Sequence, residues 1–163
     1  MMAGFAGFLK EPCQLKPYIL ESLKIKKRVI ERDEFDKTER QLFNYGHTFG
    51  HAIESVTDYR INHGQAVTMG MDISNFLSWQ RGYIREETFH YLHSILANNL
   101  PVFSLSPKSW KGYLQALLKD KKNIGTSLGC ILTRGPGKMF KTQLAFDEGF
   151  KQDIFLYFSL VRR

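Results

Sequence analysis

The chain has 163 residues, a length typical of one domain that can bury a sizeable core. Its hydrophobic fraction of 43% is close to the average of globular proteins, and its formal charge of +7 favours an anionic partner. No run of lysine and arginine exceeds three residues, and no DNA- or RNA-binding motif occurs, so we expect no nucleic-acid partner.

Targeting signals and cysteine usage indicate the compartment. The stretch from Met1 to Leu9 lacks the basic and long apolar regions of a signal peptide. No apolar stretch approaches membrane-spanning length, so no membrane partner is expected. Cys13 and Cys130 show neither metal-binding spacing nor disulfide density, which favours a reducing compartment. The sequence therefore predicts a cytoplasmic protein.

The N-terminal part combines one helical pattern with a charged loop. Residues 1–14 show no period and resemble a frayed end, whereas apolar residues recur at helical spacing from Pro17 to about Arg32. The lysines and arginine of this helix are by default a solvated face. Charged residues 31–39 predict a loop, within which Asp33 suits a loop or capping role better than a chemical one.

The centre of the chain holds a histidine cluster. His47 and His51 are four residues apart in a helix predicted from about Tyr45 to Val56, so both lie on one face, which Glu54 continues. After a break at residues 57–62, His63 opens another helix and can approach the same point. A pair of packed or solvated histidines is the common alternative, but three histidines in seventeen residues favour a site for one ion or substrate.

The remaining patterns predict a mainly α fold, a compact helical domain with one small β-hairpin. His90 and His93 lie on one of these helices and receive no catalytic role. The expected elements are helices from His63 to near Gly82, Glu86 to Asn98, Pro107 to Asp120 and Asp147 to about Val161, and strands Ser127 to Thr133 and Lys138 to Leu144.

The histidine cluster resembles a known signature. The run NYGHTFGHAIE (residues 44–54), followed by HGQAVTMGM (63–71), is similar to that of 3-dehydroquinate synthases and related sugar phosphate cyclases. These usually read LN-aromatic-GHTFGHAIE and then HGEAVAIGM. The likeness extends upstream to Lys26, Asp33 and Arg40, and downstream to the DKK block at residues 120–122. Gln65, in place of the usual glutamate, is a departure that bears on the exact substrate.

The resemblance implies roles for individual residues. His47 and His63 would be metal ligands, and His51 would contact substrate and assist proton movement. Lys26, Arg40 and Asn44 would hold the substrate at the catalytic centre, the arginine suiting a carboxylate. One of Lys121 and Lys122 would contact phosphate, although cations are favoured at this helix end in any case; the choice between these readings stays open.

The resemblance also implies an activity. Such enzymes are lyases of the shikimate pathway of aromatic amino acid biosynthesis, using NAD and a divalent metal, usually zinc, to cyclise a seven-carbon sugar acid phosphate with loss of phosphate. Their third metal ligand, a glutamate, and their NAD-binding domain precede the region matched here. We therefore expect residues 1–163 to be a single C-terminal metal- and substrate-binding domain, weak in zinc binding and inactive without the N-terminal half.

Other functions remain open at this point. The chain could belong to another sugar phosphate cyclase, although an intact His51 favours the dehydroquinate branch. It could also be a stand-alone, non-catalytic binding module. The partners that the resemblance implies are an anionic sugar phosphate and the NAD-binding half of the same enzyme, and a homodimer is compatible with it.

Overall fold

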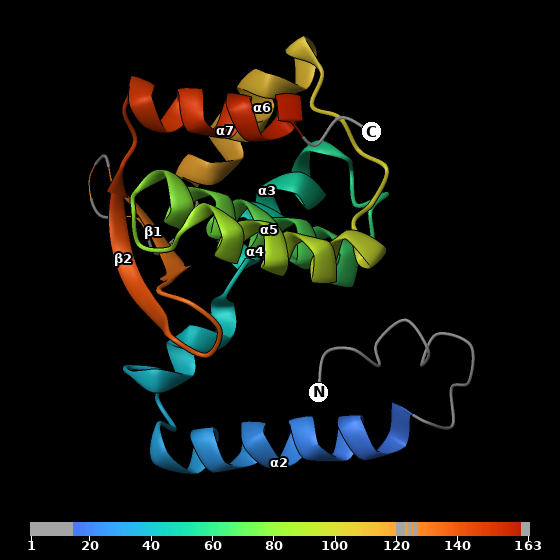
Figure 1. Cartoon of the computed structure of the whole chain (residues 1–163), viewed down its shortest axis with the longest axis vertical. Helices are drawn as coiled ribbons and strands as arrows, with labels where there is room; N and C mark the ends of the chain where they lie inside the picture. Colours follow the sequence, from blue (N-terminus) through green and yellow to red (C-terminus); the bar gives the residue numbers. More distant parts are fainter. Residues whose placement is uncertain (1–14, 120–122, 124, 126, 161–163) are drawn as a thin grey trace. The chain divides into compact units, whose positions relative to one another are not determined.

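The computed structural model describes residues 15–119, 123, 125 and 127–160. It divides into two compact units, residues 1–43 and 44–163, which are described separately below (Figure 1). The prediction of one domain over the whole chain stays a prediction. In the described part of the chain, no helix is long and apolar enough to cross a membrane.

The first unit contains the predicted N-terminal helix, α2 (Lys16–Arg32), none of whose residues is buried. Asp33 follows as its C-terminal cap and is itself buried. The Asp33 carboxylate accepts hydrogen bonds from the backbone N–H groups of Lys37 (2.8 Å), Thr38 (2.7 Å) and Arg40 (3.1 Å). The predicted capping role of Asp33 is confirmed, and the turn leads into a 3₁₀ helix, η2 (Glu39–Asn44).

The second unit is built around α4 (His63–Gln80), most of whose residues are buried. Its neighbours are α3 (His47–Val56), α5 (Glu86–Leu96), strand β1 and α7 (Glu148–Leu160), so apolar surface is covered around much of its circumference. In Figure 1, α6 (Pro107–Leu118) and α7 lie above the layer that contains α3, α4 and α5. The side chains Ile73, Leu77 and Tyr157 are fully buried at the centre of this core.

A two-stranded antiparallel hairpin lies at the edge of this helical layer (Figure 1). Strand β1 (Ser127–Thr133) pairs with β2 (Met139–Ala145), with Ser127 opposite Ala145 and Thr133 opposite Met139. All but the first residue of β1 are buried, because this strand packs on α4. A short 3₁₀ helix, η3 (Ala97–Asn99), completes the elements of this unit.

The predicted fold class is confirmed, with small shifts at element ends. The histidine helix begins at His47 rather than Tyr45 because Gly46 has a left-handed φ of +80°, which no α-helical residue adopts. Strand β2 begins at Met139 rather than Lys138 because the N–H of Lys138 closes the hairpin turn onto the carbonyl of Gly135 (3.0 Å). The α5 pattern ends in η3 rather than as a continuous helix.

Glycines let α3 and α4 approach backbone to backbone. A Cβ atom on Gly70 would lie 1.9 Å from the Gly46 carbonyl oxygen and 2.8 Å from the Gly50 nitrogen. A Cβ atom on Gly50 would lie 3.0 Å from the carbonyl oxygen of Ala66. These distances are shorter than carbon contacts allow, so larger side chains at these positions would separate the two helices.

Replacing Gly70 with alanine tests this contact. Because the added methyl group meets backbone rather than a flexible side chain, we expect Gly70→Ala to lower the free energy of unfolding by at least about 1–3 kcal/mol. The control is Gly64→Ala in the same helix, where the nearest atom is the Asn62 Oδ1 at 3.7 Å. That variant should stay within about 0.5 kcal/mol of the parent chain in urea denaturation. Equal stability of both variants would refute the close-packing account.

Asp33 generates a prediction about pH. The hydrogen bond from the backbone N–H of Lys37, helped by those from Thr38 and Arg40, lowers the pKa of Asp33 from 3.8 to about 2. Since the pKa is lower in the folded state, the charged form stabilises the turn above about pH 4. This stabilisation should be lost as the pH falls from about 4 to about 2.

The measurements are an NMR titration of the Asp33 carboxyl carbon and hydrogen exchange of the amides of Lys37, Thr38 and Arg40. Asp33→Asn should speed exchange at these amides near neutral pH. In this variant, the protection of the amides relative to an unfolded chain should no longer fall between pH 4 and 2. The control is Asp36→Asn in the same turn, where asparagine tolerates the left-handed φ of 55°. A titration midpoint of Asp33 at or above 3.8 would contradict the capping geometry.

Candidate functional site

The site begins where α3 begins. His47 is the first residue of the helix, and its Nδ1 lies 3.3 Å from the backbone carbonyl oxygen of Tyr45. A carbonyl oxygen only accepts hydrogen bonds, so this contact favours a proton on Nδ1. In the neutral ring, that tautomer leaves Nε2 as the nitrogen that can bind a cation.

The start of α4 brings the third histidine to α3. Residues Asp58 and Tyr59 both adopt left-handed φ angles, 49° and 57°, and turn the chain back. Asn62 then caps α4: its Oδ1 accepts from the N–H of Gln65 (3.0 Å) and its Nδ2 donates to the Gln65 Oε1 (2.9 Å). His63 is the first residue of α4 and its Nδ1 lies 3.0 Å from the Glu54 Oε1.

The three imidazole rings converge as their spacing predicts. Ring centres are 5.3 Å apart for His47 and His51, 5.3 Å for His47 and His63, and 5.9 Å for His51 and His63. A zinc–nitrogen bond is about 2.0–2.1 Å, so imidazoles around one tetrahedral ion have centres roughly 5 Å apart. The observed separations between ring centres are close to this value.

Glu54 was predicted to continue the histidine face of the helix but was given no role at the site. It is buried, with 8% of its surface exposed, although it lies beside two exposed histidines. Potential ligand atoms of His51, Glu54 and His63 all lie within 4.8 Å of one another, a set that does not include His47. The His-x-x-Glu spacing from His51 placed Glu54 on the same face, and that spacing was the available signal for a role.

Two arrangements of a divalent ion fit these donors. In one, the Glu54 carboxylate binds the ion directly with His51 and His63. In the other, Glu54 accepts the Nδ1 proton of His63 and orients the ring, which leaves the Nε2 of His63 to bind the ion beside His47. The donor set of imidazoles and a carboxylate suits zinc or another first-row divalent metal in both cases.

Polar contacts beneath the site hold Tyr45 on α4. Its hydroxyl donates to the Asn75 Oδ1, and burial raises the pKa of Tyr45 above its ordinary value. Further along, the fully buried Asp72 accepts hydrogen bonds from the Tyr157 hydroxyl (2.8 Å) and from the Nδ1 of His93 (2.8 Å). His93 is thus a structural partner of Asp72, in agreement with its exclusion from the predicted site.

The predicted substrate residues of the first unit are described on their own. Lys26 is exposed on α2. Its neighbours Lys24, Lys27 and Arg28 form exposed ion pairs with glutamates, whereas no ion pair of Lys26 with a described carboxylate is present. Arg40 lies in η2, where its Nη1 donates to the carbonyl of Glu34 (2.6 Å).

The other predicted substrate residues are Asn44 and the lysine pair. Asn44 is the last residue of η2, half-buried, and three residues before His47. Lys121 and Lys122 lie outside the described residues, so the choice between them stays open. The side chain of Gln65, the departure from the family signature, accepts a hydrogen bond within the cap of α4.

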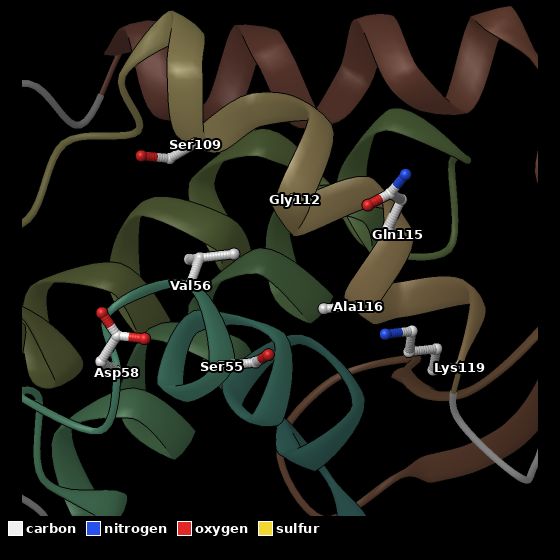
Figure 2. A pocket seen from close by; sticks show the side chains of 8 residues that line it. All are labelled: Ser55, Val56, Asp58, Ser109, Gly112, Gln115, Ala116 and Lys119. Atoms are coloured by element: carbon white, nitrogen blue, oxygen red, sulfur yellow. The ribbon is translucent and has the colours of Figure 1, made fainter.

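A cavity of about 340 Å³ lies near the end of α3, against α6 (Figure 2). Gly112 and Ala116, one turn apart on α6, leave this space because their side chains are small. Figure 2 shows Asp58 and Lys119 on opposite sides of the cavity. None of the predicted site residues that the structure describes lines it.

Comparison with known proteins identifies the family. The profile described as 3-dehydroquinate synthase C-terminal matches residues 6–123. The chain belongs to this family. It is 35% identical over 125 residues to the 3-dehydroquinate synthase of Alkaliphilus metalliredigens, and 37% identical over 132 residues to that of Dictyoglomus turgidum. These matches cover 76% and 80% of the chain but 35% and 37% of the relatives, so the chain spans about a third of their length.

A solved structure extends the family likeness to the fold. The crystal structure of 2-deoxy-scyllo-inosose synthase complexed with carbaglucose-6-phosphate, NAD+ and Co2+ matches with a TM-score of 0.73 and 25% identity. The match covers 89% of this chain and 42% of that one. The structure is therefore that of the C-terminal domain of 3-dehydroquinate synthase-like enzymes, and the expected family membership is confirmed.

The convergence of donors predicts how zinc binding responds to mutation. In calorimetric titration of the 163-residue chain, His63→Ala and Glu54→Gln should each lower zinc affinity about 10- to 100-fold, because one loses a donor and the other a ligand or an orienting partner. The control is His90→Ala on α5, whose exposed ring pairs with Glu86 (3.4 Å); this variant should leave zinc affinity unchanged. If Glu54→Gln leaves zinc affinity unchanged, Glu54 takes no part in binding the ion, and the weak, two-ligand site expected from the sequence is supported instead.

Proposed function

We propose that this chain is the metal- and substrate-binding domain of a 3-dehydroquinate synthase, which cyclises a seven-carbon sugar acid phosphate and eliminates phosphate. The observation that supports the proposal is the convergence of His47, His51 and His63 at one point beside a buried carboxylate. The relatives are named 3-dehydroquinate synthases, and the proposal assigns the reaction of that name to the enzyme of which this chain would be a part.

The histidines would divide two tasks. By resemblance, His47 and His63 hold a divalent ion, zinc in our proposal, which polarises the hydroxyl group of the substrate that is to be oxidised. His51, one turn along the same face of α3, contacts the substrate and moves a proton. Glu54 then orients His63 through its Nδ1, which keeps the Nε2 of that ring directed to the ion.

Cations would hold the two anionic ends of the substrate. The guanidinium of Arg40 suits a carboxylate, because its planar fork can donate two parallel hydrogen bonds. Lys26 and one of Lys121 and Lys122 would add positive charge, and Asn44 a neutral polar group. The exposed side chain of Lys26, which forms no ion pair with a described carboxylate, is available for such a contact.

The partner and the compartment follow from this assignment. Hydride transfer requires the nicotinamide within a few ångströms of the reacting carbon, and the protein must supply that position. Because the chain spans about a third of its relatives' length, we propose that an N-terminal half binds NAD and completes the metal site. The free thiol of Cys130 agrees with a cytoplasmic location.

A second candidate is another sugar phosphate cyclase. The structural match to 2-deoxy-scyllo-inosose synthase supports it, at 25% identity. The higher identity of 35–37% to 3-dehydroquinate synthases, together with His51 in place, favours the dehydroquinate reaction. A non-catalytic binding module is the remaining alternative.

Reconstitution tests the proposed reaction. The chain alone should release no phosphate from the seven-carbon sugar acid phosphate in the presence of NAD and zinc, because the nicotinamide is not positioned. Adding a cognate N-terminal half, fused or as a separate chain, should restore turnover. Phosphate release is the measurement. The comparison substrate is glucose 6-phosphate, the sugar phosphate that the carbaglucose-6-phosphate of the matched structure resembles.

Single variants of the reconstituted enzyme then separate the roles of the histidines. His51→Ala should lower turnover more than it lowers zinc occupancy, whereas His47→Ala should lower both. If His51→Ala instead lowers zinc occupancy and His47→Ala does not, His51 is the metal ligand. That result would agree with the grouping of the potential ligand atoms of His51, Glu54 and His63. Turnover by the chain alone would overturn the need for a second half, and no turnover with a well-folded cognate half would favour the non-catalytic module.

A further inference from the structure

A second cavity, of about 410 Å³, lies where the hairpin turn meets the start of α5. Its lining is strongly basic: Arg85 precedes α5, and Arg134 and Lys138 flank the turn between β1 and β2. The cavity beside α6 in Figure 2 differs in this respect, since its lining contains one carboxylate, Asp58, and one amine, Lys119.

Three cations line this basic cavity. None of Arg85, Arg134 and Lys138 forms an ion pair with any carboxylate in the described ranges of the chain. The nearest acids in sequence are Glu86 and Glu87 in the first turn of α5, of which Glu86 pairs with His90 at 3.4 Å. The lining itself contains no acidic residue, so the positive charge is not neutralised within the cavity.

Contacts with aromatic rings hold Arg134 in place. Its guanidinium carbon lies 4.2 Å from the ring centre of Phe140 and 5.9 Å from that of Tyr83. The two rings pack edge to face with their centres 5.1 Å apart. Cation–π contacts use the face of the guanidinium group, so its N–H groups can still donate hydrogen bonds in the plane of the group.

Hydrogen bonds fix the hairpin turn to the core. The N–H of Arg134 donates to the Lys138 carbonyl (3.0 Å), and the N–H of Lys138 donates to the Gly135 carbonyl (3.0 Å). The N–H of Thr133, at the end of β1, donates to the hydroxyl of Ser78 on α4 (3.0 Å). The turn that carries two of the cations is therefore hydrogen-bonded, through Thr133, to α4, and Tyr83 follows three residues after the end of that helix.

From these observations we infer that the basic cavity is a binding site for a small polyanion that carries phosphate groups, such as a phosphorylated metabolite. Its volume suits a ligand of that size. Two guanidinium groups and an amine offer charge-assisted hydrogen bonds, the hydroxyl of Thr88 offers another donor, and the start of α5 adds the positive end of a helix dipole.

This site is separate from the histidine cluster. His63 begins α4, whereas the cavity lies beyond the other end of that helix, whose 18 residues span roughly 27 Å. A ligand in the basic cavity thus does not occupy the place proposed for the cyclase substrate. The inference stands whether or not the proposed reaction is confirmed.

Inorganic pyrophosphate is the probe. Titrated into the ¹⁵N-labelled 163-residue chain, it should shift the amide signals of Arg85, Thr88, Gly135 and Lys138. The double variant Arg134→Gln/Lys138→Gln should bind it at least about tenfold more weakly, the change expected when a hydrogen bond to a charged group is lost. The charge-matched control is Lys108→Gln/Lys111→Gln on α6, two exposed lysines outside the cavity, which should change affinity less than about twofold.

Further variants keep the test decisive. If the double variant fails to fold, Arg85→Gln, an exposed residue with no side-chain partner among the described residues, should still weaken binding several-fold. His63→Ala should leave pyrophosphate affinity unchanged, which separates this site from the proposed reaction. Equal weakening by the cavity and control pairs, or shifts confined to residues near His63, would overturn the inference.

Discussion

The close approach of α3 and α4 is the constraint on which the site depends. A Cβ atom on Gly70 would sit 1.9 Å from the Gly46 carbonyl oxygen, so the two backbones touch where most helix pairs are separated by side chains. The contact aligns the histidine face of α3 with the first residue of α4. With larger residues at this contact, His63 would be displaced by ångströms, a distance comparable to a metal–nitrogen bond.

The central helix serves both the core and the site. On α4, Ile73 and Leu77 are fully buried, yet Asp72 and Asn75 are buried as well. These two polar residues accept hydrogen bonds from Tyr157 on α7, His93 on α5 and Tyr45 before α3. Since Tyr45 also offers its backbone carbonyl to His47, the core hydrogen bond at Asn75 stabilises the residue that orients a site imidazole.

Much of the fold could be predicted because its signals are local. Helical periodicity located α2, α4 and α6, and Pro and Gly marked several of their ends. The start of α3 could not be read from periodicity, because it follows the left-handed φ of Gly46, where an added Cβ atom would lie 2.6–2.7 Å from atoms of Met71 and Val67 on α4. Such a contact joins residues more than twenty positions apart, and no local pattern reports it.

The same distinction applies to the site. Spacing alone predicted that His47, His51 and His63 converge, because i, i+4 geometry and a short return loop are local properties. It did not predict that Glu54 becomes buried and lies 3.0 Å from His63, since this depends on how tightly α4 packs. The roles of Lys26 and Arg40 rest on resemblance, because the two units are described separately.

The distribution of charge shows why net charge alone was a poor guide to partners. On α2, Lys24 and Arg28 pair with Glu21, and Lys27 with Glu31, in exposed contacts that contribute little to stability and cancel locally. At the basic cavity, Arg85, Arg134 and Lys138 form no ion pair with a carboxylate in the part of the chain that the structure describes. Part of the formal excess of +7 is therefore concentrated where a rigid turn and two aromatic rings hold it. An anion gains more from such a preorganised cluster than from the same number of mobile surface lysines, because less side-chain freedom is lost on binding.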